Sequence, residues 1–126
     1  MITHTVLHAM PSPDRAERRG PITRGGALDL MRTFPFEAEV RKHLREPDLT
    51  VPTLTFADEF GAEFTVWSAD PNRYRIWIPH LFATAEDIAG RLEVLECLAL
   101  FLDGDWEELE TRVGELREKY SPGSGR

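Results

Sequence analysis

The sequence has little of what marks secreted and membrane proteins. Its one cysteine cannot form a disulfide within the chain, so nothing in it requires an oxidising compartment. The longest apolar run, residues 97–102, is far too short to cross a bilayer. The opening MITHTVLHAM lacks the basic start and the long apolar stretch of a secretory signal. We therefore expect a soluble protein with a cytoplasmic location and no membrane partner.

Recognisable catalytic and ligand-binding motifs are also lacking, and no motif identifies a family. Gly25-Gly26 alone is not a phosphate-binding loop. His4 and His8 have the spacing of helical metal ligands but no third ligand nearby, and neither His43 nor His80 has a recognisable catalytic partner in sequence. We therefore predict no cofactor and no metal site.

An enzyme is the least favoured class of function. Its reacting groups would have to come from distant positions, such as Asp58, Glu63 and His80. No spacing among these residues indicates a reaction class. We accordingly predict a protein that is not an enzyme.

Acidic charge is in excess, with 22 acidic against 15 basic residues and a formal net charge of −7. Residues 79–126 alone hold eleven acidic and five basic side chains. Such a body repels nucleic-acid phosphates, so a nucleic-acid partner is not expected. If electrostatic steering brings a partner to this chain, that partner should be basic. The excess charge can equally serve solubility alone.

Turn-forming residues divide the chain into three parts. Pro11, Pro13, Gly20, Pro21 and Gly25 interrupt any regular element near the start, although the first ten residues could pair as a short edge strand. We predict an extended arm over residues 1–27. A single α+β domain should follow over residues 28–120, and the composition SPGSGR predicts a flexible tail over residues 121–126.

The domain should begin with one helix over about residues 34–45. Phe36, Val40 and Leu44 recur at four-residue spacing, which places them on one face of a helix. Thr33 is a candidate N-cap, and Pro47 should end the element. Residues 27–32 could add a short helical turn before it.

A three-stranded antiparallel β-meander is predicted next, with strands at residues 53–57, 63–68 and 74–78. The segments between them, DEFGA and ADPNR, are rich in turn formers. Two five-residue loops give a register that gathers the apolar side chains on one face. These core-side residues are Leu54, Phe56, Phe64, Val66, Ile76 and Ile78.

A two-helix hairpin should complete the domain. Thr84 with Asp87 resembles a capping box, followed by apolar residues at helical spacing as far as Leu102. Asp103-Gly104 should break this helix, and Asp105 with Glu108 resembles a second capping box for a helix that extends to about residue 120. Cys97, in the first of these helices, should be a buried and unreactive thiol.

The other face of the meander carries the most informative residues. In the predicted register it presents Thr53, Thr55, Thr65, Trp67, Arg75 and Trp77, with Trp67 opposite Arg75. Tryptophan and arginine are enriched in binding hot spots, and an arginine over an indole gains a cation–π interaction. Three alternatives stay open: cover by a helix or the arm of the same chain, a surface for a partner, or a platform for a small ligand.

A second candidate contact is the acidic run of Asp103, Asp105, Glu107 and Glu108, which continues to Glu110. Calcium binding is excluded because an EF-hand loop needs Gly at its sixth position and Glu at its twelfth, which are here Glu108 and Gly114. Acidic side chains at a helix start are also favoured by the helix dipole without any partner. The remaining functional interpretation is a docking patch for a basic protein.

These observations favour a small acidic protein that binds another protein and acts by occlusion. A bacterial immunity or antitoxin-like inhibitor of a basic effector has this size and charge, and the analogy goes no further than size and charge. The partner-binding residues would be Trp67, Arg75 and Trp77, with the acidic run steering the encounter. The alternative is a small subunit or adaptor of a larger assembly that uses arm 1–27, and a homodimer is a further option.

Overall fold

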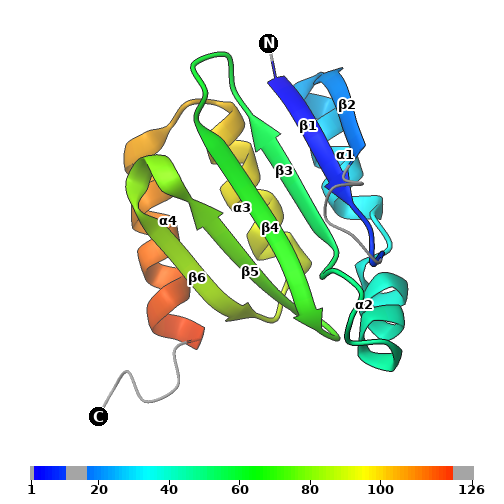
Figure 1. Ribbon diagram of the computed structural model, residues 1–126. Helices are drawn as coiled ribbons and strands as arrows, with labels where there is room; N and C mark the ends of the chain where they lie inside the picture. Colours follow the sequence, from blue (N-terminus) through cyan, green and yellow to red (C-terminus); the bar gives the residue numbers. More distant parts are fainter. Residues whose placement is uncertain (1, 11–16, 121–126) are drawn as a thin grey trace.

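The computed structural model describes residues 2–10 and 17–120, with backbone only for residues 17–19 (Figure 1). Along the chain, the elements in these residues are β1 (Ile2–Leu7), β2 (Glu17–Ile22), α1 (Arg24–Thr33), α2 (Phe36–Arg45), β3 (Thr53–Ala57), β4 (Glu63–Asp70), β5 (Arg73–Ile78), the 3-10 turn η2 (Pro79–Leu81), β6 (Ala83–Ile88), α3 (Arg91–Leu102) and α4 (Trp106–Tyr120). The predicted α+β class is confirmed. The predicted tail, residues 121–126, lies outside the described residues.

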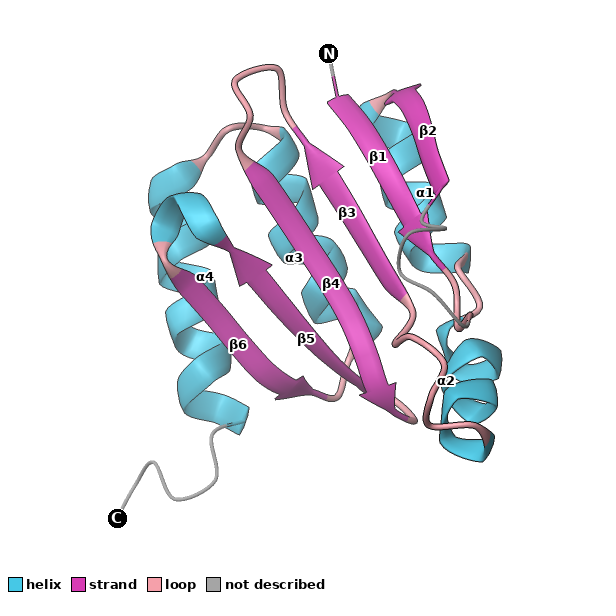
Figure 2. Ribbon diagram, in the orientation of Figure 1, coloured by secondary structure: helices cyan, strands magenta, loops and turns pink. Residues whose placement is uncertain are grey.

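The described strands form one antiparallel sheet of six, in the order β2-β1-β3-β4-β5-β6. Helices α1, α3 and α4 lie on one side of this sheet, and α2 packs at the end of β4 (Figures 1 and 2). A single cluster of buried side chains fills the space between the two layers, from Val6 in β1 to Leu116 in α4. The fold is thus a two-layer structure with its helices on one face of the sheet.

The register of the central strands agrees with the prediction. Leu54 pairs with Val66, and Val66 pairs in turn with Ile76. The side chains expected on the core side are fully buried: Leu54, Phe56, Phe64, Val66, Ile76 and Ile78. The sheet is nevertheless larger than the predicted meander, because β1 and β2 flank it on one side and β6 on the other.

The predicted arm over residues 1–27 is wrong where the structure describes it. Residues 2–7 form a strand inside the sheet, between β2 and β3. Gly20 has a φ of 69° beside a register shift between His4 and Thr5, so it supplies a β-bulge and does not end the strand. Pro21 is tolerated because β2 is an edge strand, which leaves one side without ladder hydrogen bonds.

The single helix predicted over residues 34–45 is two helices, α1 and α2. Thr33 is the last residue of α1 and not an N-cap, and α2 begins at Phe36. Phe34 has a ψ of 131° because the following proline disfavours helical backbone at that position. The N-cap of α1 is Thr23, whose hydroxyl accepts a hydrogen bond from the Gly26 N–H at 3.0 Å.

The predicted capping box of Thr84 and Asp87 is also wrong. Both residues lie in strand β6, where the Thr84 hydroxyl donates to the Ile76 carbonyl at 3.0 Å. A register shift interrupts the pairing of β6 with β5, and Asp87 at that shift has a φ of 57°. The residues of β6 therefore lack the regular alternation that predicts a strand. Helix α3 therefore begins only at Arg91.

The predicted pair of C-terminal helices is present as α3 and α4. Asp105 caps α4, since its carboxylate accepts a hydrogen bond from the Glu108 N–H at 3.3 Å. Cys97 is buried in α3, where desolvation raises the pKa of its thiol to about 12. A thiol with that pKa is almost entirely protonated at neutral pH, as expected for an unreactive cysteine.

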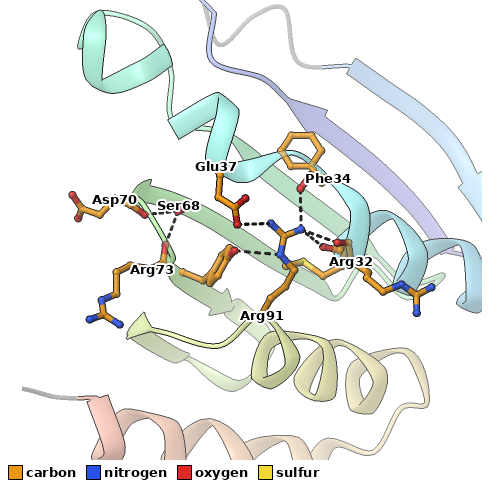
Figure 3. Close-up of polar contacts among 9 residues, drawn as sticks. Arg32, Phe34, Glu37, Ser68, Asp70, Arg73 and Arg91 are labelled. Atoms are coloured by element: carbon orange, nitrogen blue, oxygen red, sulfur yellow. Dashed lines mark hydrogen bonds and ion pairs between the residues drawn. The ribbon is translucent and has the colours of Figure 1, made fainter. Parts of the chain in front are cut away.

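Arg91, the first residue of α3, holds three helices and the sheet together (Figure 3). Its guanidinium donates to the carbonyl oxygens of Met31, Arg32 and Phe34 at the end of α1, at 3.2, 2.9 and 2.9 Å. It also donates to the Tyr74 hydroxyl at 3.2 Å and lies over the Tyr74 and Phe36 rings. One side chain thereby provides hydrogen-bond donors for carbonyl groups at the end of α1 that have no partner within the helix.

Glu93 links the two C-terminal helices. The Tyr120 hydroxyl donates to its carboxylate, and the Lys119 ammonium lies 3.0 Å from it. Desolvation by burial raises the pKa of Glu93, but the hydrogen bonds from Tyr120 and Lys119 outweigh it and leave that pKa below its ordinary value. The charged form of Glu93 therefore stabilises the folded state.

Replacing Arg91 with methionine should lower the free energy of unfolding by about 2–4 kcal/mol, because it removes the donors and leaves several carbonyl groups unsatisfied. Urea denaturation at neutral pH measures this loss. The control is Arg32→Met, which breaks an exposed ion pair with Asp29 and should cost less than about 1 kcal/mol. An equal decrease in the free energy of unfolding in the two variants would show that Arg91 stabilises the fold no more than an exposed arginine does.

Acidification should weaken the protein in part through Glu93. Because its pKa is lower in the folded state, its contribution is present above the unfolded pKa and is lost as the pH falls through the folded value. The free energy of unfolding should fall less steeply between about pH 6 and pH 3 in Glu93→Gln than in the wild type. Glu107→Gln, at an exposed position, should retain the wild-type slope, and identical slopes in all three proteins would contradict this role of Glu93.

Candidate binding surface

The side of the sheet opposite the helices carries a continuous set of polar and aromatic side chains. One row crosses the sheet from Thr5 through Thr55 and Thr65 to Trp77 and Thr84. A second row joins Thr53, Trp67 and Arg75. We call these eight residues the open face: Thr5, Thr53, Thr55, Thr65, Trp67, Arg75, Trp77 and Thr84.

No described segment of the chain covers the open face. The helices pack against the opposite side of the sheet, as Figure 2 shows. Along β4, Val66 is fully buried whereas its neighbours Thr65 and Trp67 remain partly exposed. Such alternation is typical of an antiparallel sheet with one solvated face. Three alternatives were open for this face. The described helices and strands β1 and β2 do not cover it.

Arg75 is the charged group at the centre of this aromatic set. It pairs with Trp67 across β4 and β5 as predicted. The expected cation–π contact with an indole is not formed, since the cation–π contacts among the described residues belong to Arg91 and Lys119. Within the described part of the chain, Arg75 also makes no side-chain hydrogen bond or ion pair. Its guanidinium is thus free to contact something else.

The predicted acidic residues belong to a different surface, at the turn between α3 and α4. Asp103 is paired with Arg24, whose Nε and Nη2 donate to the carboxylate at 2.7 and 3.1 Å. The hydrogen bond from Arg24 holds the pKa of Asp103 below its usual range. Asp105 caps α4. These two carboxylates thus have structural roles.

Glu107 and Glu108, in the first turn of α4, are exposed. Their side chains make no hydrogen bond or ion pair with the residues that the structure describes. The structure therefore separates the predicted partner-binding set into two groups: Trp67, Arg75 and Trp77 lie on the sheet, whereas the acidic residues belong to the helical layer.

A pocket of about 510 Å³ lies where the β3–β4 turn, η2 and the start of α4 meet. We call it the end pocket, and its lining residues are Asp58, Phe60, Gly61, Ala62, Glu63, Pro79, His80 and Trp106. Asp58 and Glu63, at the two ends of one turn, therefore share a cavity with His80 from a later segment of the chain. The lining contains no serine, threonine, cysteine or lysine, so it offers none of the usual hydroxyl, thiol or amine nucleophiles.

The remaining histidines have structural partners. His4 Nδ1 lies 3.1 Å from the Gly20 carbonyl oxygen, and His43 Nδ1 lies 2.7 Å from that of Leu49. His8 Nδ1 lies 3.1 Å from a carboxylate oxygen of Glu39. In residues 2–10 and 17–120, no three His, Cys, Asp or Glu side chains are placed to hold a metal ion. No described helix is long and apolar enough to cross a membrane.

Comparisons of the chain with protein-family models, with curated proteins and with solved structures find no match. The functional argument therefore rests on the surfaces themselves. Two features of those surfaces escape sequence reasoning. One is the end pocket, which needs three segments that are far apart in the chain. The other is the exposure of Phe60 and Phe82, each 88% exposed. The sequence does not distinguish these two phenylalanines from the buried ones.

Proposed function

We propose that this protein binds another protein through the open face. The observation that carries the proposal is the pair of tryptophans beside an arginine that has no partner among the described residues, on a sheet face that no described segment covers. Large aromatic side chains and arginine dominate the energetics of protein interfaces. Their exposure costs free energy in the isolated protein, and a partner would recover it on binding.

A protein partner is favoured over a small ligand because neither Trp67 nor Trp77 lines any of the pockets described for this chain. Small molecules bind in concave sites that enclose most of their area. The hollow on this side of the sheet is lined by residues of β1–β4 such as Thr5, Thr55 and Glu63, and neither Trp67 nor Trp77 contributes to it. An aromatic surface with threonines beside it, spread over several strands, suits the broad contact of two proteins.

The mode of action that best suits such a surface is occlusion of the partner. The chain would then be a stoichiometric inhibitor, like an immunity or antitoxin protein, acting on a basic effector. Glu107 and Glu108 support this reading because they are exposed and free of ion pairs within the described chain. Acidic groups of this kind accelerate the encounter with a basic protein.

The alternative role, a subunit that wraps a neighbour with arm 1–27, receives less support. The described parts of that arm, β1 and β2, are paired within the chain's own sheet. They are therefore occupied in the folded protein. An adaptor or a homodimer remains compatible with the open face, and the nature of the captured partner separates these roles.

Replacing both Trp67 and Trp77 with alanine should abolish the interaction and preserve the fold. The partner is first captured with the tagged wild-type protein and identified, and its affinity is then measured by calorimetry. We expect the double variant to weaken binding by about 100-fold or more, since each hot-spot residue is worth about 2 kcal/mol or more. The matched control is Leu92→Ala, which removes an apolar side chain that is 73% exposed on the helical layer, and it should bind like the wild type.

The stability of the same double variant tells an open face from a covered one. Truncation of a tryptophan in a core costs about 3–5 kcal/mol, so loss of two would unfold a small domain. On the open face each truncation should cost less than about 2 kcal/mol, as urea denaturation would show. A double variant that fails to fold, or one that binds with wild-type affinity, would refute the proposal.

If Glu107 and Glu108 steer a basic partner, removing their charge should slow association and leave the contacts of the complex intact. Glu107→Gln with Glu108→Gln should lower the association rate constant by about two- to tenfold at low salt and leave the dissociation rate unchanged. Stopped-flow measurements at about 0.02 and 0.5 M salt test this, because screening should remove the difference. An association rate that responds neither to salt nor to these substitutions would exclude electrostatic steering toward a basic partner.

A further inference from the structure

The end pocket combines carboxylates with aromatic rings. Asp58 and Glu63 bring two carboxylates to its lining, and Trp106 and His80 bring two rings whose centroids are 4.6 Å apart. Phe60 also lines the pocket, with 88% of its side chain exposed. Negative charge beside aromatic faces is the environment that stabilises an organic cation.

The walls of the pocket are held by hydrogen bonds within the chain. One Asp58 carboxylate oxygen accepts from the Phe60 and Ala62 N–H groups, both at 2.9 Å, and the Asp58 N–H donates to the Ala62 carbonyl at 2.9 Å. On the other side, the Phe82 N–H donates to the Pro79 carbonyl and closes η2. The backbone of the two turns that line the pocket is thus ordered without a ligand, which lowers the entropic cost of binding.

Glu63 contributes to the pocket a carboxylate that is not used in a described structural interaction. It is exposed, and its carboxylate makes no hydrogen bond or ion pair with the described residues. It also lines the hollow on the open side of the sheet, so the end pocket adjoins that side. The lining includes no arginine or lysine that could neutralise Glu63.

We propose that the end pocket binds the guanidinium group of an arginine side chain on a partner protein. A planar guanidinium can both stack on an aromatic ring and donate to a carboxylate, and the lining offers both kinds of group, which the compact ammonium of lysine uses less well. A free amino acid is not the ligand, because its carboxylate would need a cationic side chain that the lining does not provide. This pocket is separate from Trp67 and Trp77, so the inference stands without the proposed function.

The test is an NMR titration of the full-length protein, observed at its three tryptophan indole N–H signals. The probe is N-acetyl-arginine amide, and the matched uncharged probe is N-acetyl-citrulline amide. We expect the Trp106 signal, assigned with Trp106→Phe, to shift and saturate with a Kd of about 1–10 mM, while the Trp67 and Trp77 signals stay in place. Citrulline amide should bind about tenfold more weakly, because it has the same shape without the charge.

Two variants connect the binding to the carboxylate. Glu63→Gln should weaken the arginine probe by about threefold or more, whereas Glu46→Gln, which removes the same charge at the exposed end of α2, should have no effect. The inference is overturned if the Trp106 signal does not respond, if both probes bind alike, or if the two variants behave alike. Tighter binding of free arginine than of its blocked amide would overturn the assignment to a protein side chain.

Discussion

The alternation of apolar and polar side chains along the strands is the constraint on which the rest of this structure depends. In β3, β4 and β5 every second residue is fully or almost fully buried under the helices, so the residues between them must point to the other side. With α1, α3 and α4 on one side of the sheet and α2 at the end of β4, no described helix is left to cover those residues. The partial exposure of Trp67 and Trp77 is therefore a direct consequence of the topology.

Several long-range polar contacts join the helices to one another and to the sheet, in addition to the buried apolar cluster between the layers. Arg91 joins the end of α1 to the sheet through Tyr74, and Arg24 joins the start of α1 to the end of α3 through Asp103. Glu93 joins α3 to the end of α4. These contacts supplement the buried apolar cluster that packs the helices against the sheet, and the open face lies on paired strands of that sheet. Side chains on paired strands need little backbone ordering when a partner binds to them.

Sequence reasoning succeeded where one local pattern was sufficient. The register of β3, β4 and β5 follows from alternation and two short loops, and with it the shared face of Trp67, Arg75 and Trp77. It failed where backbone irregularities interrupt the pattern. Gly20 and Asp87, both with positive φ, sit at register shifts that hide strands β2 and β6.

Other features could not be predicted because they depend on contacts between distant segments. Arg91 resembles any surface arginine in the sequence, yet its hydrogen-bond partners lie 17 to 60 residues away. Asp58, Glu63 and His80 can be listed as candidates from the sequence, but only the meeting of the β3–β4 turn with η2 and Trp106 makes them one pocket. Local periodicity carries no information about contacts between segments that are distant in the sequence.

The central claim of this account is that Trp67 and Trp77 are partly exposed in the free protein and become buried by a protein partner. Hydroxyl-radical footprinting of the free and the partner-bound protein, read by mass spectrometry, tests it most directly. The account predicts that both tryptophans are oxidised in the free protein and protected in the complex, while Leu92 is oxidised equally in both. Tryptophans already protected in the free protein, or still fully oxidised in the complex, would contradict it.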